Sequence, residues 1–143
     1  MDIDLNAPVI SRHSTTIDAP LETAWALHID VSAWTTWQSD ITAAVLDTPF
    51  APGASFSWET YGLSITSSVH EVEPLRRTCW GGPAHGIDGV HVWRFTEVDG
   101  GVLVETEESW DGEPVRADVA GMQAGLDASL VAWLSHLKTA AER

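Results

Sequence analysis

The sequence predicts an α+β fold in which a curved antiparallel sheet of about seven strands wraps around a long C-terminal helix. Three observations support this prediction. Apolar residues alternate with polar ones through much of residues 41–111, which is typical of strands with one buried face. Short Pro-Gly, Gly-Pro and Asp-Gly turns interrupt this region, and connections so short join antiparallel strands. An apolar stripe with helical spacing follows at about residues 114–140.

Two short helices are expected between the first strand and the rest of the sheet. Residues 9–17 are rich in β-branched side chains and predict that first strand. Pro20 then opens a short helix, because its fixed φ suits the first helical turn, and another short helix is expected at 31–37. The remaining strands are predicted at residues 41–46, 55–60, 63–72, 77–81, 89–98 and 102–110.

The C-terminal helix is predicted from one continuous apolar stripe, formed by Val115, Val119, Met122, Leu126, Leu130, Trp133 and Leu137. Sheet and helix each present one apolar face, so they must bury these faces together. Gly121 and Gly125 stand inside the helix, where a glycine costs up to about 1 kcal/mol relative to alanine. Close packing on the sheet would explain them, and so would room for a ligand beside Met122 and Leu126.

The composition predicts a single domain over residues 1–143, with a core from about 9 to 140. The net charge of −14 excludes binding to nucleic acid and to anionic membrane surfaces, which need basic patches. No signal peptide and no apolar run long enough to span a bilayer is found, so we expect a cytoplasmic protein, monomeric or homodimeric.

Cysteine and histidine provide no sign of a metal or disulfide site. Cys79 is the only cysteine, so an intramolecular disulfide is impossible. Cys79 and Trp80 are adjacent in a predicted strand and point to opposite faces, so Cys79 is not expected to act as a nucleophile on the face that carries Trp80. The histidines lack metal-ligand spacing, and no P-loop, GxSxG or GxGxxG motif occurs. We therefore expect neither a metal nor a cofactor. His85 lies in the glycine-rich segment 81–86 and is a candidate for a cavity mouth.

Asp99-Gly100 is the strongest short-range hairpin signal in the chain. A two-residue turn there pairs Phe95 with Val104 on one face and Arg94 with Glu105 on the other. The first is an apolar pair and the second is an opposite-charge pair suited to a solvated face. A shift of the register by one residue would break both pairs. The same register places His91 opposite Glu108, Trp93 opposite Thr106, and both pairs on the inward face.

The predicted His91–Glu108 pair is the candidate catalytic site. A carboxylate beside a histidine fixes the tautomer and raises the imidazole pKa, while burial opposes that rise. Such a pair can serve as a general acid or base. The alternative is a buried polar pair that satisfies itself and only fixes the strand register.

Eight tryptophans in 143 residues either fill a large core or line a cavity. Parity places four of them, Trp58, Trp80, Trp93 and Trp110, on one inward wall with isolated polar groups, which resembles a ligand pocket more than a dry core. Trp25 and Trp133 are interpreted as helix-packing residues, with Trp34 and Trp37 at the junction of helices and sheet. The candidate ligand-binding residues are Trp37, Phe56, Trp58, Ser67, Val69, Thr78, Trp80, His85, Trp93, Thr106, Trp110, Met122 and Leu126.

Several segments together resemble the polyketide cyclase/dehydrase proteins of the START/Bet v 1-like (SRPBCC) superfamily. The resemblance extends over about residues 9–140 and is carried by Ile17–Trp25, Asp30 with Trp34 and Trp37, Val69–Arg77 leading to Trp80, Gly89–Phe95, Gly100-Gly101 and Glu107–Gly112. Leu75 and Thr78 depart from the pattern, where proline and leucine are frequent. No universal catalytic residue exists to be carried over.

The resemblance implies the helix-grip fold with a deep apolar cavity between sheet and long helix. It also implies a small hydrophobic ligand, such as a lipid, polyketide or hormone. Three functions stay open: a carrier or sensor of an aromatic or polyketide-like ligand, a cofactor-independent enzyme that cyclises or dehydrates it, and a module whose cavity regulates a partner. In the enzyme, Ser67, Thr106 or an indole N–H would hydrogen-bond a developing oxyanion.

Overall fold

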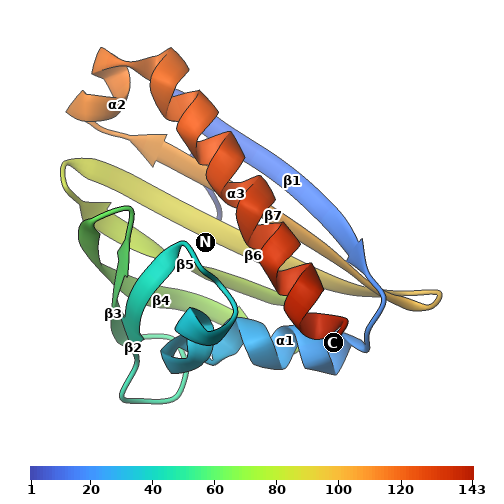
Figure 1. The fold of residues 1–143 in the computed structure, drawn as a ribbon. Coiled ribbons are helices and arrows are strands. Elements are labelled where there is room, and N and C mark those ends of the chain that lie inside the picture. The colour runs from blue at the N-terminus through green and yellow to red at the C-terminus, as the bar shows by residue number, and fades with distance from the viewer.

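One antiparallel sheet in the order β1-β7-β6-β5-β4-β3-β2 forms the body of the computed structural model, which describes residues 1–143 (Figure 1). Each strand is joined to its neighbour in sequence from β2 to β7, and β1 closes the far edge by pairing with β7. The strands are β1 (Val9–Ile17), β2 (Ile41–Val45), β3 (Ser55–Thr60), β4 (Leu63–Glu73), β5 (Arg77–Ala84), β6 (Ile87–Val98) and β7 (Gly101–Asp111). The predicted fold class is confirmed.

The helices lie on one side of this sheet. The longest, α3, runs diagonally across the sheet with β1 alongside it and α1 near its C-terminal end (Figure 1). The short helices between β1 and β2 are present where the sequence predicts them, the second as a 3-10 helix. The helical elements are α1 (Leu21–Ile29), η1 (Val31–Thr36), α2 (Glu113–Ala117) and α3 (Val119–Ala141).

The β6–β7 hairpin has the register that Asp99-Gly100 predicts. His91 pairs with Glu108, and Arg94 with Glu105. The closest ion pair of Arg94 nevertheless runs diagonally, with 2.6 Å between its guanidinium and the Glu107 carboxylate. The face opposite the helices thus carries these charged side chains, beside a small apolar cluster of Ile3, Cys79, Val90 and Val92. The inward face carries His91 and Glu108 together.

The predicted strand over 77–81 is too short. β5 continues to Ala84, and the expected glycine-rich loop is reduced to the two-residue turn His85-Gly86. Both turn residues have positive φ, 52° and 80°, as a tight hairpin turn with the twist of the sheet requires. Pro83 stands within the strand opposite Asp88. His85 thus sits at the tip of a hairpin.

The predicted single helix over about 114–140 is divided into α2 and α3 at Asp118. The Asp118 side chain caps α3 by accepting a hydrogen bond from the backbone N–H of Gly121 at 3.1 Å. A Cβ at residue 121 would lie 2.2 Å from a carboxylate oxygen of Asp118, which explains why glycine stands there. The break lets the stripe residue Val115 stay buried on α2, while Val119 is exposed.

The core under α1 and η1 is dominated by aromatic side chains. Trp34 is fully buried at its centre and donates its indole N–H to the backbone oxygen of His28 at 2.9 Å. His28 is itself buried and lies 2.8 Å from the Thr78 hydroxyl through Nε2. Burial lowers the pKa of His28 to about 3, so the ring is neutral.

Polar contacts fasten α3 to the edge of the sheet. Asp127 accepts hydrogen bonds from Ser11 on β1 and from Gln123, and its carboxylate lies 3.2 Å from Nε2 of His13. The Gln123 amide also donates to the backbone oxygen of Ile10 at 2.9 Å. This polar cluster holds the helix over β1 and therefore sets its position relative to the other strands.

Candidate functional site

A cavity of about 720 Å³ lies between α3 and the part of the sheet formed by β3 to β7. A volume of this size is typical of sites for small organic ligands. The cavity wall is formed by Gln38, Asp40, Trp58, Thr60, Tyr61, Leu63, Ile65, Ser67, Trp80, Gly81, Gly82, Ala84, His85, Ile87, Gly89, His91, Glu108, Trp110, Gly121, Met122, Gly125, Leu126, Ala128, Ser129, Ala132 and Trp133.

Three indoles form the most aromatic part of the wall. The ring centroid of Trp133 on α3 lies 5.8 Å from that of Trp58 and 6.0 Å from that of Trp80. Trp58 donates its N–H to the Ser67 hydroxyl at 3.0 Å, which fixes the indole against β4. The buried indole N–H groups of Trp80 and Trp133 have no acceptor in the protein. These rings offer broad apolar surfaces suited to stacking on a flat molecule.

Most of the residues that α3 contributes to the cavity wall are small. On α3 they are Gly121, Gly125, Ala128, Ser129 and Ala132, at positions that recur on one helix face. A Cβ on Gly125 would meet no atom within 4 Å, so this glycine borders open space. Of the two explanations for Gly125, the structure therefore favours room beside the helix over close packing.

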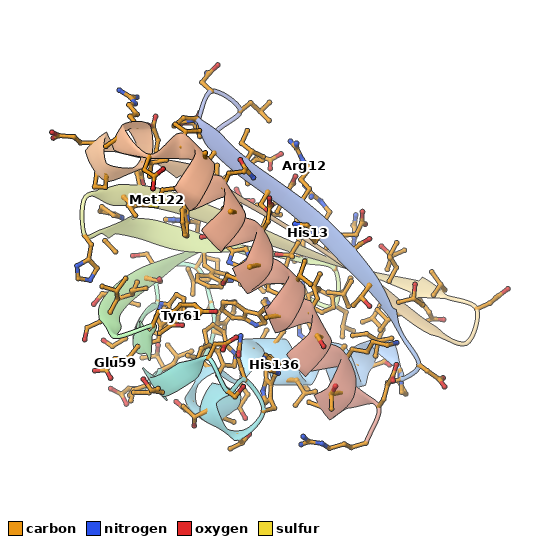
Figure 2. All side chains as sticks on the ribbon, turned by 45° about the horizontal axis from the view of Figure 1, so that its top comes forward. Arg12, His13, Glu59, Tyr61, Met122 and His136 are labelled. Atoms are coloured by element: carbon orange, nitrogen blue, oxygen red, sulfur yellow. The ribbon has the colours of Figure 1, made fainter.

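One side of the cavity mouth is formed by the β3–β4 hairpin. Figure 2 shows Tyr61 of this hairpin and Met122 of α3 on the same side of the helix, whereas His13 lies on the other side. Tyr61 is exposed and has a φ of 50°, which a side chain larger than glycine rarely adopts. Burial and the Asp40 carboxylate raise the pKa of its hydroxyl, which also interacts with Ser129. Tyr61 and Ser129 therefore both border the cavity, one from the hairpin and one from α3.

A short chain of polar contacts lies at the β6–β7 end of the cavity. Nδ1 of His91 lies 3.2 Å from one carboxylate oxygen of Glu108, and the other oxygen accepts the Trp110 indole N–H at 2.7 Å. Nε2 of His91 lies 2.7 Å from the Thr106 hydroxyl. His91 and Thr106 are buried, and both His91 and Glu108 line the cavity.

The His91 ring has a polar partner at each nitrogen. Nε2 lies 2.7 Å from the Thr106 hydroxyl, which itself lies 3.3 Å from the backbone oxygen of Val92. Nδ1 lies 3.2 Å from a Glu108 oxygen. Because the hydroxyl can either donate to Nε2 or accept from it, both neutral tautomers of His91 fit these distances.

Burial shifts the pKa values of both side chains so that their neutral forms are favoured. Burial, with a smaller contribution from the nearby His28, lowers the pKa of His91 well below its usual value. Burial raises the pKa of Glu108 to about 7, and the Trp110 N–H opposes that rise. The pair therefore exchanges one proton near neutral pH, and the titrating group is the carboxyl.

Comparison with known proteins establishes the family. A family model described as "Polyketide cyclase / dehydrase and lipid transport" matches residues 8–142. The chain belongs to this family. No match to a curated protein reaches significance.

Solved structures of low sequence identity share the helix-grip START fold. A hypothetical protein from Helicobacter pylori, jhp0584, has a TM-score of 0.85 at 20% identity, covering 97% of this chain and 91% of that one. A START superfamily protein from Mycobacterium smegmatis has a TM-score of 0.77 at 12% identity, covering 93% and 97%. The di-domain ARO/CYC StfQ from the steffimycin biosynthetic pathway has a TM-score of 0.74 at 16% identity. The match covers 94% of this chain and 50% of StfQ. Identities this low show the fold alone.

The cavity contains nine of the residues that the sequence proposes for a site: Trp58, Ser67, Trp80, His85, His91, Glu108, Trp110, Met122 and Leu126. The other six do not line it: Trp37, Phe56, Val69, Thr78, Trp93 and Thr106 are buried side chains of the surrounding core. Thr78 and Thr106 instead hold the two buried histidines, His28 and His91. The ring of Trp93 lies between those same histidines, 4.9 Å and 5.1 Å from their centroids.

Sequence reasoning missed the largest helix residue of the wall. Trp133 was interpreted as helix packing, yet it both packs and lines the cavity. Gln38, Asp40, Tyr61 and Ser129 also line the cavity without having been proposed. Trp133 belongs to the predicted apolar stripe, which faces the sheet, so the sequence contained a signal for it. Gln38, Asp40 and Tyr61 stand in turns, and Ser129 is a polar helix residue that is not part of that stripe, so no periodicity marks them.

No group of three or more His, Cys, Asp or Glu side chains is arranged to hold a metal ion. No helix is both long and apolar enough to cross a membrane.

The raised pKa of Glu108 predicts how the stability of a Glu108→Gln variant depends on pH. Unfolded chains release this proton near the ordinary value of 4.5, whereas the folded protein keeps it up to about pH 7. The folded state binds more protons in that window, so this group makes the wild type less stable as pH rises. Glu108→Gln has no such proton to release, so its stability does not fall with pH for this reason. From pH 5 to pH 8 its stability should improve relative to wild type by about 2 to 3 kcal/mol.

Urea unfolding of both proteins at the two pH values measures this difference. Burial keeps His28 and His91 neutral in both folded proteins, because it lowers both pKa values well below the ordinary value, so their titration does not affect the comparison. Glu105→Gln on the exposed face of the same strand is the control. A stability difference between wild type and Glu108→Gln that is the same at pH 5 and pH 8 would contradict the raised pKa.

Proposed function

We propose that this protein binds a small, flat, hydrophobic molecule, aromatic or polyketide-like, in the cavity between α3 and the sheet. The observation that carries the proposal is the cavity itself, about 720 Å³ with a wall of indoles and small helix residues. A chain that needed only a packed core would close this space, because an empty apolar cavity costs stability. The family's description, which includes lipid transport, is consistent with this function.

A variant that narrows the cavity tests ligand binding. Gly125→Phe places an aromatic ring where the glycine borders open space, and helix formation does not suffer, since glycine is the poorer helix former. The neutral fluorescent probe N-phenyl-1-naphthylamine should bind wild type and bind the variant about tenfold more weakly, because apolar contact area is lost. Energy transfer from tryptophan to the probe reports the Kd.

Ala124→Phe is the matched control, because Ala124 is exposed on α3 and does not line the cavity. It should bind the probe as wild type does. Circular dichroism confirms that both variants are folded. Equal probe affinity in folded Gly125→Phe and wild type would contradict the proposal.

A second candidate function, proton transfer to or from the bound molecule, is favoured by the pair at the β6–β7 end. The carboxyl of Glu108 lines the cavity and has a pKa of about 7, which suits a general acid or base at neutral pH. His91, hydrogen-bonded to Thr106, orients that carboxyl. This division of roles reverses the one that the sequence suggests, in which His91 transfers the proton and Glu108 orients it. Cyclisation with dehydration is a reaction that such a group could catalyse.

Hydrogen–deuterium exchange into a bound ketone separates an enzyme from a carrier. We expect wild type to accelerate exchange of the α hydrogens of 2-tetralone in D₂O, with a rate that rises with pH and levels off above about 7 as Glu108 loses its proton. Glu108→Gln and His91→Ala should lose this acceleration while they still bind N-phenyl-1-naphthylamine. Unaltered exchange in both variants would contradict the roles of Glu108 and His91, and no acceleration in wild type would assign the protein to the carrier class.

A further inference from the structure

A second polar group lies in the cavity, distant from Glu108 in the strand order. Gln38 follows η1 and precedes β2, and its side chain is only 2% exposed although it lines the cavity. The sheet order places β2 and β7 at the two ends of a row of six strands, so the Gln38 and Glu108 sites lie at opposite ends of that row. The indoles of Trp58 and Trp80 stand on strands between them.

The position of Gln38 is fixed by its own hydrogen bonds. Its backbone N–H donates to Trp34 at 2.8 Å, and its backbone oxygen accepts from Ile41 at 3.1 Å. The side-chain oxygen accepts the backbone N–H of Asp40 at 2.9 Å. Because an amide oxygen must be the atom that accepts this bond, the orientation of the amide is determined.

The amide nitrogen of Gln38 is left with two N–H donors and no protein acceptor. Gln38 is one of the residues that line the cavity, so this donor is available to a molecule bound there. A ligand that supplies an acceptor oxygen here gains a hydrogen bond at a group already held in place.

Charges nearby restrict the kind of acceptor. Asp40 also lines this end of the cavity, and its carboxylate lies 3.5 Å from Nε2 of His136. No lysine or arginine lines the cavity, and the chain carries a net charge of −14. An anionic oxygen would therefore be repelled and uncompensated, whereas a neutral carbonyl oxygen would not.

From this arrangement we infer that Gln38 is a binding residue for a carbonyl oxygen at one end of an elongated, neutral, polycyclic ligand whose other end reaches Glu108. This inference rests on the proposed function, because it names the ligand class that the cavity takes. The indoles between the two polar ends contact the apolar body of the ligand, and Gln38 sets its orientation. A carbonyl held at this end leaves the rest of the molecule to extend toward the titrating carboxyl.

Two probes that differ in one oxygen test the inference. 2-Acetylanthracene has a carbonyl at the end of three fused rings, and 2-ethylanthracene has the same shape without it. Wild type should bind the ketone about tenfold more tightly, the usual effect of one hydrogen bond to a preoriented donor. Gln38→Met, similar in size but without the donor, should bind both probes equally and keep the wild-type affinity for 2-ethylanthracene.

Gln38→Glu at pH 8 provides a second variant that does not depend on the tolerance of the core for methionine. It keeps an oxygen to accept the Asp40 N–H and replaces the amide donor by a charged carboxylate oxygen, which cannot donate to the ketone. It should also lose the preference for the ketone. A preference that survives in a folded Gln38 variant, or is absent in wild type, would overturn the inference. Binding of neither probe to wild type would instead contradict the proposed function.

Discussion

The contact of Trp133 with the sheet is the constraint on which the rest of the site depends. Its indole, on α3, lies 5.4 Å from Trp34, 5.6 Å from His91 and 5.7 Å from Trp93 between ring centroids. A side chain of this size keeps the helix axis away from the strands beneath it. Toward the N-terminal end, most of the α3 residues that border the cavity are glycine, alanine or serine, and Met122 and Leu126 do not fill the resulting gap. The cavity follows from that contrast between one large spacer and several small residues.

Polar side chains lie at only a few places around the apolar cavity. Asp127 with Ser11 and His13 fixes the helix over β1, outside the cavity. Inside it, buried polar groups are concentrated at Gln38 and at the His91–Glu108 pair, and Ser67 is occupied by Trp58. A buried carboxyl at a pKa of about 7 is unfavourable for stability at alkaline pH, so its retention beside a cavity is more readily explained by function than by folding.

Strand register and faces were predictable from the sequence because they depend on local chemistry. Asp99-Gly100 specifies a two-residue turn, and from that turn the pairing of His91 with Glu108 follows. Period-two alternation identifies which face a residue occupies, but it does not show how far along the curved face the helices reach. Trp93 and Thr106 share the inward face with His91, yet Trp93 packs against His28 of α1 and Thr106 is buried against His91, so neither borders the cavity. A helical stripe shows which side of a helix faces the sheet, but it does not show how far the helix lies from the sheet. The stripe therefore could not show that Trp133 lines a cavity. Gln38 has no periodic signal, because its orientation comes from a turn.

The eight indole N–H signals in a ¹H–¹⁵N NMR spectrum provide the most direct test that the cavity binds ligands, because half of the tryptophans line it. On titration of wild type with N-phenyl-1-naphthylamine, the signals of Trp58, Trp80, Trp110 and Trp133 should shift most. Those of Trp25, Trp34, Trp37 and Trp93 should change less, since these side chains are buried outside the cavity. Saturable binding that leaves the four cavity signals unchanged, or shifts all eight equally, would contradict the account.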